Sequence, residues 1–491
     1  MTTTKTNIEL LSQRLLENCD LTVAGTVRAR RTADIAASPI SVGFETLDRY
    51  HFDPKRTYPH LAELGAKWAR VQTGWNRCER EKGIYDFAWL DEIVDDLLAV
   101  GVQPFFNLGF GNLLYTPDAP HDSARGYVAF YYGDEAAQAW RDYVDALTRH
   151  FADRVHHWEV WNEPNTKGFW NPGNANPADY VRLLRETVPI VRANVPDATV
   201  IGGVFAAVRP VGALRFGEAC FREGMGDWID KLAWHPYRAT PEHGFREEVQ
   251  TWRRLIAQHA PHVGLWQGEC GCQSQRGGLC EFLDMKHLDE RVQAKWVLRR
   301  MLSDLRLGFE FTQYFHTVDL FDYIKHDGPS GQNQYMGLLR GDDYSPKPSF
   351  FALQTLCSLF DSKTQPWGAD VYFERRCEDT EGNPVNPAMI ETATFRRDDT
   401  VIYAWWMPSD FDHPFPGAGV AATVWHGTET PWKTPVLIEP VTQTVYVLPR
   451  EQTTAEGGAF QLPVLDGPLL VTDAAMLERE GLMEDAARST L

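Results

Sequence analysis

Residues 156–170, HHWEVWNEPNTKGFW, begin as an apolar run and end in a polar turn. Trp158 and Trp161 are typical of a β-strand that is covered on both faces. The next two residues, Asn162 and Glu163, place an amide and a carboxylate directly before a proline. Burial of a carboxylate costs free energy unless the charge has a partner. Glu163 therefore needs either an ion-pair partner or a chemical role.

Seven further short runs, rich in β-branched and aromatic residues, accompany this one between residues 38 and 350. They are SPISVGFE (38–45), WARVQTG (68–74), VQPFFNLG (102–109), TVIGGVFA (199–206), KLAWHPY (231–237), GLWQGECG (264–271) and FEFTQYFH (309–316). Each has the length and composition of a strand. The sequence therefore predicts eight strands, with HHWEVWNE (156–163) as the fourth.

Segments with helical periodicity separate these strands. In YDFAWLDEIVDDLLAVG (85–101), Leu90, Ile93 and Leu97 form an i, i+3, i+4 stripe, and Gly101 suits the residue after a helix. Similar stripes run through residues 134–151 and 289–308. Strands that alternate with helices form a parallel sheet, and eight such units predict a (β/α)8 barrel. A doubly wound open sheet is the alternative, but no GxGxxG motif follows the first strand.

After KPSFFALQTLCSLFD (347–361), which we expect to be the last barrel helix, the pattern becomes that of short antiparallel strands. The runs are MIETATFRR (389–397), TVIYAWWMPS (400–409), GVAATVWHG (419–427), PVLIEPV (435–441), TVYVLPRE (444–451) and AFQLPVLDGPLLVTDA (459–474). They alternate apolar and polar residues and are divided by turns, which predicts an antiparallel β-sandwich. The predicted organisation is an N-terminal extension (1–37), part of which is available to pair with the sandwich through VAGTVRAR (23–30), then the barrel (38–360), the sandwich (361–480) and a tail (481–491).

The composition excludes several classes of partner. A formal net charge of -19 argues against nucleic acid and against an anionic membrane surface. No run of 18 apolar residues is present, and the first 20 residues lack the apolar core of an export signal, so we expect a cytoplasmic protein. Cys270, Cys272 and Cys280 lie close together, but CxC is not a common zinc pattern, and structural thiols are expected. The 17 Trp suit either a large core or flat surfaces on which sugars stack.

Polar residues stand at the ends of the predicted strands, where barrel chemistry is located. Glu163 ends the fourth strand and Glu269 ends the seventh. The other candidates from strand ends are Arg70, Asn107, Asn162, His235, Tyr237, Tyr314 and His316, and the candidate sugar platforms are Trp75, Trp170 and Trp266. Each has an ordinary structural interpretation: a helix cap, an inter-strand ion pair, or, for His235 and the Trp residues, core packing. Two glutamates at matching positions favour a shared site.

Paired carboxyl groups can divide two tasks between them. A protonated one donates to a leaving oxygen, and an ionised one attacks a sugar carbon. Arg70 and the Tyr237 hydroxyl would keep Glu269 ionised, whereas the aromatic surroundings of Glu163 would keep its proton. For a nucleophilic carboxylate we expect a carboxyl separation of about 5 Å, against roughly 6.5–9.5 Å for inversion.

At this point WEVWNEPN in the fourth strand, HPY in the sixth and WQGECG in the seventh resemble clan A of the glycoside hydrolases. KPSFFAL followed by a β-sandwich is similar to family 39, the β-xylosidase and α-iduronidase type. The resemblance covers about residues 40–350 and implies a metal-independent retaining hydrolase. It implies that Glu163 is the acid/base and Glu269 the nucleophile, and that Asn162 binds the sugar 2-hydroxyl.

The resemblance also implies roles for the other strand ends. Arg70 and Tyr237 would hold the nucleophile, and His235 would line the pocket. The eighth strand lacks the Trp that many members have there, so Tyr314 or His316 would form the floor of the −1 subsite. The strand-seven text GECGCQS also differs from the TEFG-like text common in family 39.

The leading hypothesis is a retaining exo-β-glycosidase, without cofactor, that hydrolyses short oligosaccharides or glycosides, with homo-oligomerisation open. An endo-glycanase of the same clan is the first alternative, because the long loops near the barrel mouth would serve a pocket or a cleft equally. The second is a carbohydrate-binding protein that keeps the barrel without turnover.

Overall fold

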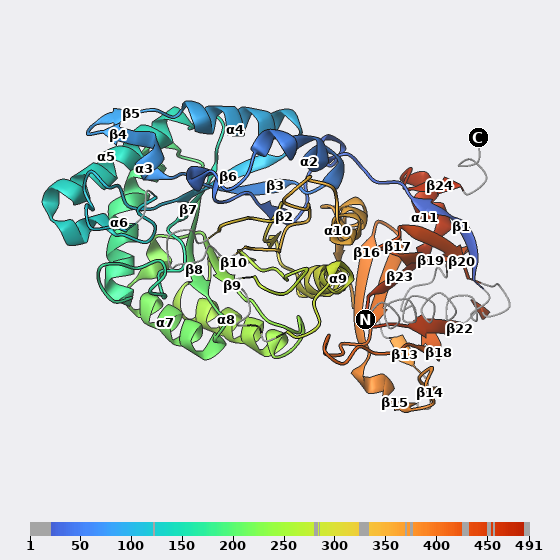
Figure 1. The fold of residues 1–491 in the computed structure, drawn as a ribbon. Helices are drawn as coiled ribbons and strands as arrows, with labels where there is room; N and C mark the ends of the chain where they lie inside the picture. The colour runs from blue at the N-terminus through green and yellow to red at the C-terminus, as the bar shows by residue number, and fades with distance from the viewer. Residues whose placement is uncertain are drawn as a thin grey trace.

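The computed structural model describes residues 21–120, 123–278, 283, 285–323, 333–368, 371–373, 377–424, 432–448, 453–454 and 457–485. The first 20 residues, the last six and Cys280 lie outside the described residues, so the predictions made for them are not addressed. Figure 1 shows two bodies, a ring of helices around a barrel and a β-sheet domain beside it.

Eight parallel strands close into a barrel in the order β10-β11-β2-β3-β6-β7-β8-β9. The strands are β2 (Ile40–Gly43), β3 (Trp68–Gln72), β6 (Gln103–Leu108), β7 (His157–Val160), β8 (Thr199–Ala206), β9 (Lys231–His235), β10 (Gly264–Gln267) and β11 (Thr312–Tyr314). β11 pairs with β2 through Gln313 and Ser41, which closes the ring. The predicted (β/α)8 barrel is confirmed, and the open-sheet alternative is wrong because no barrel strand is left as an edge.

Helices surround the barrel (Figure 1). They are α2 (Tyr58–Leu64), α3 (Trp75–Cys78), α4 (Ala88–Ala99), α5 (Asp134–His150), α6 (Pro177–Asn194), α7 (Pro210–Arg222), α8 (Phe245–His259), α9 (Glu290–Arg306) and α10 (Pro348–Leu359). α4 turns its predicted stripe inward, with Leu90 and Leu97 fully buried. Gly101 follows it at φ 85°. A Cβ there would lie 2.7 Å from the Ala33 Cα, so this position also requires a glycine for close approach.

Because side chains along each barrel strand point alternately inward and outward, the barrel has two hydrophobic clusters, one on each side of the sheet. Phe105 and Ala233 belong to a small cluster that includes Trp266 stacked on Phe311, with ring centroids 4.3 Å apart. Their neighbour Phe106 belongs to the large cluster shared with the helices. Because successive strand residues point to opposite faces, the small cluster fills the barrel interior.

The second domain consists of antiparallel strands, as predicted. Its larger sheet has the order β12-β16-β17-β23-β19-β20-β1-β24, and the smaller has β13-β18-β22-β21. The strands of the larger sheet are β1 (Thr22–Val27), β12 (Thr364–Pro366), β16 (Glu391–Arg397), β17 (Thr400–Trp406), β19 (Pro435–Glu439), β20 (Thr444–Val447), β23 (Leu469–Asp473) and β24 (Met483–Asp485), with α11 (Ala474–Arg479) between the last two. Those of the smaller sheet are β13 (Val371–Phe373), β18 (Ala418–Val424), β21 (Thr453–Thr454) and β22 (Gly457–Val464).

Two short two-stranded ladders complete the described strands. β4 (Glu79–Glu81) pairs with β5 (Ile84–Tyr85), and β14 (Cys377–Glu378) pairs with β15 (Pro384–Val385). The two larger sheets share a core, in which Tyr403 and Trp405 of β17 lie with Ala418 of β18 and Val464 of β22. Strand β1 pairs with β20 on one side and with β24 on the other. The first and the last described strands therefore lie in the same sheet (Figure 1).

A buried ion pair fastens the barrel to the second domain. Arg299 of α9 is fully buried and donates to Glu242 at 2.9 and 2.6 Å and to the Ser409 carbonyl at 2.9 Å. The Trp406 indole of β17 donates to the same Glu242 carboxylate at 2.7 Å. Charged groups at a buried junction fix its geometry because each needs its own partner.

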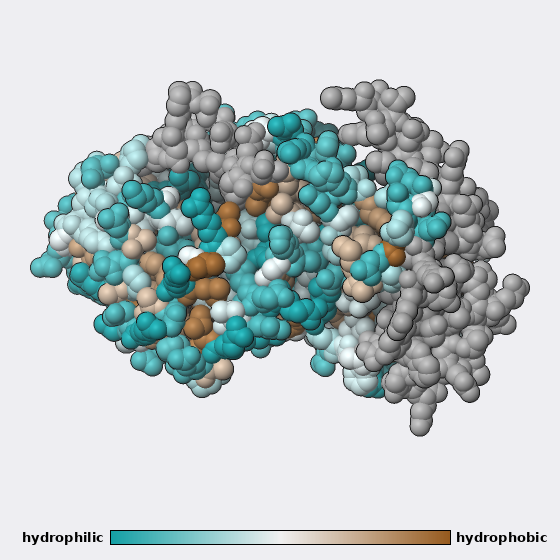
Figure 2. All heavy atoms as spheres, turned by 90° about the horizontal axis from the view of Figure 1, so that it is seen from below, coloured by the Kyte–Doolittle hydropathy of each residue, from teal (hydrophilic) through white to brown (hydrophobic). Residues whose placement is uncertain are grey.

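No helix of the described residues is long and apolar enough to cross a membrane. Hydrophilic residues dominate the described part of the face in Figure 2, and apolar groups are scattered among them over the barrel half.

The substitution Arg299→Met tests the junction. It leaves the buried Glu242 carboxylate without its cation. We therefore expect the free energy of unfolding, measured by urea denaturation, to fall by about 3–5 kcal/mol. Arg149→Met, which breaks the exposed pair with Asp145 in α5, is the control and is expected to cost less than about 0.5 kcal/mol. Equal losses in the two variants would contradict the assigned role.

Candidate active site

The barrel strands carry their polar residues on the inward side. In β3, Trp68, Arg70 and Gln72 alternate with the outward-facing Ala69 and Val71. Gln72 pairs in register with Asn107 of β6, which pairs with Glu159 of β7. Parallel strands in this register bring residues of the same orientation into one layer, so Arg70, Asn107 and Glu159 meet inside the barrel.

The turn after β7 aims Glu163. Trp161 and Glu163 both have left-handed backbone conformations, with φ 70° and 45°. Such conformations cost a non-glycine residue on the order of 1–3 kcal/mol and persist only where the surroundings enforce them. Here the Trp161 amide donates to the Leu108 carbonyl at 3.1 Å, and the Glu163 amide to the Val204 carbonyl at 3.0 Å. Bonds to both neighbouring strands therefore hold the turn.

Glu163 and Glu269 converge on His235. The His235 Nδ1 lies 2.9 Å from the Glu163 Oε1 and 3.7 Å from the Glu269 Oε2. One oxygen of each glutamate and one His235 nitrogen all lie within 4.8 Å of one another. The two glutamate side chains are 17% and 12% exposed, whereas His235 is fully buried. The two carboxyl groups thus lie close together, and each keeps a small part of its surface exposed.

Arg70 and Tyr237 hold Glu269 from the other side. The Arg70 Nη1 donates to the Glu269 Oε2 at 2.9 Å, and the Tyr237 hydroxyl donates to Oε1 at 2.7 Å. Both carboxylate oxygens therefore have a fixed donor, which orients the group and favours its ionised form.

Arg70 is fully buried and serves several acceptors at once. Its Nε donates to Glu159 at 2.7 Å, Nη1 to Glu45 at 2.9 Å, and Nη2 to the Asn162 Oδ1 at 2.7 Å. With Glu269, this single guanidinium faces three carboxylates. The five donors of a guanidinium suit such a role, and a lysine would not fill it.

The protonation states of the two glutamates follow from these partners. Burial raises the pKa of Glu163 to about 7, against the opposing charges of Arg70 and Arg125. Burial raises the pKa of Glu269 to about 7 as well, and the charge of Arg70 opposes this rise. Two such groups share one proton over the neutral range. The direct ion pair with Arg70 assigns the negative charge to Glu269 and the proton to Glu163.

His235 is neutral in this setting. Burial lowers its pKa to about 4, although the charge of Glu269 opposes the change. Its Nδ1 and the Glu163 Oε1 therefore share one hydrogen at 2.9 Å. His235 can orient the Glu163 carboxyl group without adding a positive charge beside it.

Three predicted substrate contacts lie deeper than expected. Asn107 is fully buried, and its amide donates to Glu159 at 2.8 Å and to the Trp161 carbonyl at 2.5 Å. Tyr314 is fully buried and donates to the Cys272 carbonyl at 3.3 Å. Both residues already use their polar groups to join strand ends, and their contact with a substrate stays a prediction.

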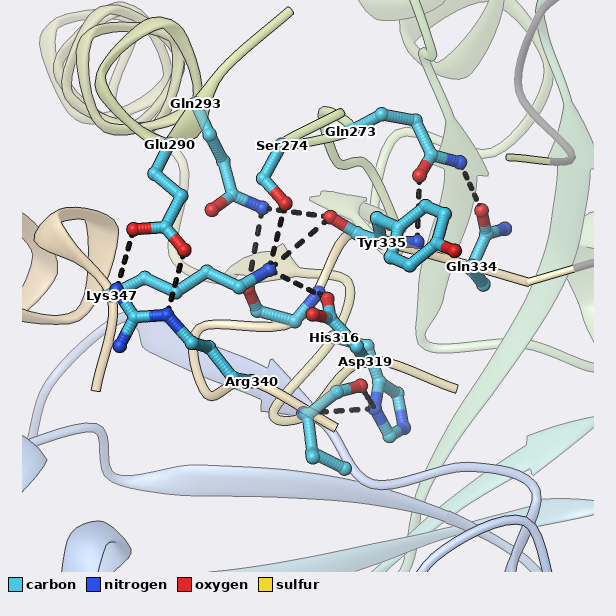
Figure 3. Close-up of polar contacts among 12 residues, drawn as sticks. Gln273, Ser274, Glu290, Gln293, His316, Asp319, Gln334, Tyr335, Arg340 and Lys347 are labelled. Carbon is cyan, nitrogen blue, oxygen red and sulfur yellow. Dashed lines mark hydrogen bonds and ion pairs between the residues drawn. The ribbon is translucent and has the colours of Figure 1, made fainter. Parts of the chain in front are cut away.

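His316, another predicted contact, is also buried and bound to backbone groups. It is fully buried, its Nδ1 lies 3.1 Å from the Val318 carbonyl, and its Nε2 lies 3.2 Å from the Glu45 carbonyl. Figure 3 shows the side chain beside the loop that follows β11. His316 therefore ties the ends of β11 and β2 together, and its place in a subsite floor stays a prediction.

The tryptophans proposed as sugar platforms belong to the core. Trp75 is fully buried, stacks on Tyr115 and Tyr143, and donates to Glu79 at 2.6 Å. Trp170 is fully buried against Trp161, and Trp266 lies in the barrel interior. Trp75 and Trp170 thus lie in the core, and their contact with a ligand stays a prediction.

Two further carboxylates belong to the site and were not singled out in the sequence. Glu45 follows β2 and accepts from Arg70 and, at 2.8 Å, from the Gln313 amide. Glu159 lies inside β7, where burial raises its pKa against the charge of Arg70. The signal for Glu159 was present, since it is the only charged residue of HHWEVW. Cys270 and Cys272, in the segment that follows Glu269, are buried.

The triad Glu163, His235 and Glu269 also has the spacing to hold a metal ion. The fixed charge of Arg70, 2.9 Å from Glu269, repels a second cation at that carboxylate. The donors are therefore better suited to holding protons than to holding a metal.

The substitution Arg70→Met tests the electrostatic balance. It leaves Glu159 and Glu269 without their cation, and the pKa values of these two carboxyl groups rise further. Ionising them then costs stability, so the loss should be largest at neutral pH and should shrink as the pH falls toward 5 and they take up protons. Thermal unfolding at several pH values measures this. A loss that is constant with pH, as expected for Arg141→Met in the partly exposed pair with Glu186, would contradict it.

Comparisons with known proteins show which family and fold this chain is similar to. The model of glycosyl hydrolases family 39 matches residues 67–250. A β-xylosidase of Geobacillus stearothermophilus is 29% identical over 213 residues, which cover 38% of this chain and 40% of that protein. β-Glucosidase 12 of Arabidopsis thaliana is 31% identical over 125 residues, 24% of this chain and 23% of that protein. The chain thus spans less than half the length of these relatives.

Solved structures share the whole architecture. A family 39 glycoside hydrolase of Bacteroides cellulosilyticus WH2 superposes with a TM-score of 0.63 at 20% identity, over 89% of this chain and 80% of that one. A family 39 β-xylosidase of Caulobacter crescentus gives 0.55 at 19% identity, over 91% and 97%. At such identities the likeness is one of fold. Together with the match over residues 67–250, it confirms that the barrel resembles family 39 of the glycosyl hydrolases.

Proposed function

We propose that the chain is a retaining β-glycosidase. The observation that carries this proposal is a pair of carboxyl groups with oxygens within 4.8 Å of each other and with different partners, Arg70 and Tyr237 at Glu269 and His235 at Glu163. This spacing supports a nucleophilic carboxylate at about 5 Å over an inverting pair, which needs roughly 6.5–9.5 Å to hold a water molecule. The likeness to glycosyl hydrolases over residues 67–250 supports the same class.

The mechanism follows from the partners of each group. Glu269, ionised and oriented by Arg70 and Tyr237, attacks the anomeric carbon as the glycosidic C–O bond breaks. Glu163 gives its proton to the departing oxygen. A water molecule, deprotonated by Glu163, then attacks the anomeric carbon and releases Glu269. The Asn162 Oδ1 is bound by Arg70, so its amide nitrogen remains to donate to the sugar 2-hydroxyl.

The similar β-xylosidases and β-glucosidases support a β-linked, neutral sugar as the substrate. Exo action on short oligosaccharides or glycosides is part of the proposal, as are a cytoplasmic location and a homo-oligomeric assembly. The endo-glycanase alternative predicts cleavage of internal bonds, which polymer digests followed by chromatography would reveal. A screen of nitrophenyl glycosides of both anomers identifies the sugar, and NMR of the first-formed anomer tests retention.

Glu269→Ala removes the nucleophile, and we expect kcat/KM to fall by on the order of 10⁴-fold or more. Glu163→Gln should lower it by about 10²–10⁴-fold on glycosides with poor leaving groups. Glu310→Gln, in a half-exposed pair with Lys231 before β11, is the control and should keep wild-type kinetics. A mechanism-based 2-fluoro glycoside should label Glu269. Saturable binding without label or turnover would favour the carbohydrate-binding alternative.

The pKa of Glu163 sets the alkaline limit of activity. Because the acid must hold its proton, kcat/KM should fall as the pH rises through about 7. A dinitrophenyl glycoside needs no proton on its leaving group, so its kcat/KM should lack this alkaline limb. If both substrates lose activity at the same pH, another group governs the limb.

A further inference from the structure

We infer that Lys347 is a positioning residue for Glu269, acting through a buried cluster that joins the loops after β10 and β11. This inference rests on the proposed function. The cluster, called the Lys347 cluster below, consists of Lys347, Asp319, Ser274 and Gln293 (Figure 3).

Lys347 is buried where few lysines are found. Its side chain is 1% exposed, directly before α10. The ammonium group lies 2.6 Å from the Asp319 Oδ1, 2.9 Å from the Ser274 Oγ and 3.5 Å from the Tyr335 carbonyl. These acceptors come from both loops, so one cation holds them together. A buried ion pair contributes little net stability compared with apolar packing, and fixing a geometry is its best-attested use.

Gln293 of α9 completes the junction from the other side. Its amide nitrogen lies 3.0 Å from the Cys272 carbonyl and 3.2 Å from the carbonyls of both Tyr335 and Gly337. Its side-chain oxygen accepts from the Ser349 hydroxyl at 2.8 Å. Residues 272–274 and 335–337 are thus bound to each other through a shared side chain.

Direct bonds join the same two segments. The Ser274 amide donates to the Tyr335 carbonyl at 2.9 Å, and the Tyr335 amide donates to the Gln273 side chain at 2.6 Å. Gln273 also donates to the Gln334 side chain (Figure 3). The Gly337 amide donates to Asp319 at 2.8 Å. Residues 273–274, after β10, are therefore bound directly to residues 334–335, after β11.

The Lys347 cluster reaches Glu269 by a short path. Residues 270–273 are buried and connect Glu269 to Ser274. The Cys270 carbonyl accepts from the Phe315 amide at 2.8 Å. A Cβ on Gly271 would lie 2.1 Å from the Phe315 carbonyl oxygen, so this segment already packs without free space. Displacement of residues 272–274 would pass along this segment to the Glu269 backbone.

A second path runs through Arg70. His316, in the loop held by Asp319, lies 3.2 Å from the Glu45 carbonyl. Glu45 in turn accepts from Arg70, which donates to Glu269. Lys347 therefore influences both the backbone of Glu269 and the cation that orients its carboxylate, while touching neither the sugar nor the reacting atoms.

The test is the rate at which a 2-fluoro glycoside with a dinitrophenyl leaving group labels Glu269, per folded molecule. That step requires only the attack by Glu269, because the leaving group needs no acid. Lys347→Met should slow labelling by about 10-fold or more. Ser274→Ala removes only the hydrogen bond from Lys347 to the Ser274 hydroxyl and should slow labelling by about 2–5-fold. If Lys347→Met fails to fold, the result for Ser274→Ala decides the test.

The matched control is Arg340→Gln. Arg340 pairs with Glu290 and joins the same loop to α9, but the pair is 36% and 33% exposed (Figure 3). It should leave the labelling rate unchanged. Wild-type labelling rates in both Lys347→Met and Ser274→Ala, or an equal decrease in Arg340→Gln, would overturn the inference while the proposed function stands.

Amide hydrogen exchange distinguishes failure of the positioning role of Lys347 from failure of the proposed function. Exchange of a peptide that covers residues 268–275 should be at least about 10-fold faster in Lys347→Met than in wild type or Arg340→Gln. Failure of the wild type to be labelled or to cleave any glycoside would end the proposed function. Unchanged exchange in Lys347→Met would then overturn the positioning role by a measurement that needs no turnover.

Discussion

The rest of the site depends on one constraint: the guanidinium of Arg70 has to neutralise buried carboxylates in the centre of the barrel. Arg70 is fully buried and donates to Glu45, Glu159 and Glu269. A charge in such a place is stable only when its partners are fixed. The surrounding strand ends therefore cannot shift without exposing an unpaired charge, and this rigidity orients Glu269.

The residues at the strand ends fall into two groups, one that joins the strands and one that carries the proposed chemistry. Asn107, Tyr314 and His316 use their polar groups to join neighbouring strand ends. Glu163 and Glu269 are partly exposed. His235 is the partner of Glu163, and Tyr237 donates to Glu269. The residues that join the strands let two acidic groups lie close together while they keep different protonation states. Separate partners make this possible, since Arg70 binds Glu269 directly and His235 binds Glu163.

The site could be predicted in part from the chain. Glu163, Glu269, Arg70, Tyr237 and His235 all come together as expected, because each stands at the end of a strand and the strands are parallel. Trp75 and Trp170 lie in the core, and the sequence could not show this because an aromatic residue near a strand end has the same signal in a core as on a ligand surface. Glu45 was missed because a single acidic residue after a strand also suits a helix cap or a surface loop.

The sequence by itself determined the barrel, the antiparallel domain and the order of the strand-end residues. Periodicity and turn residues are local properties that survive in the linear chain. Only the tertiary structure decided which polar groups face a ligand and which are consumed within the protein. It also decided where the proton of the glutamate pair resides. Those outcomes depend on distances between residues far apart in the chain, such as Arg70 and Glu269 at 2.9 Å or Lys347 and Ser274 at 2.9 Å, and burial then fixes their charge.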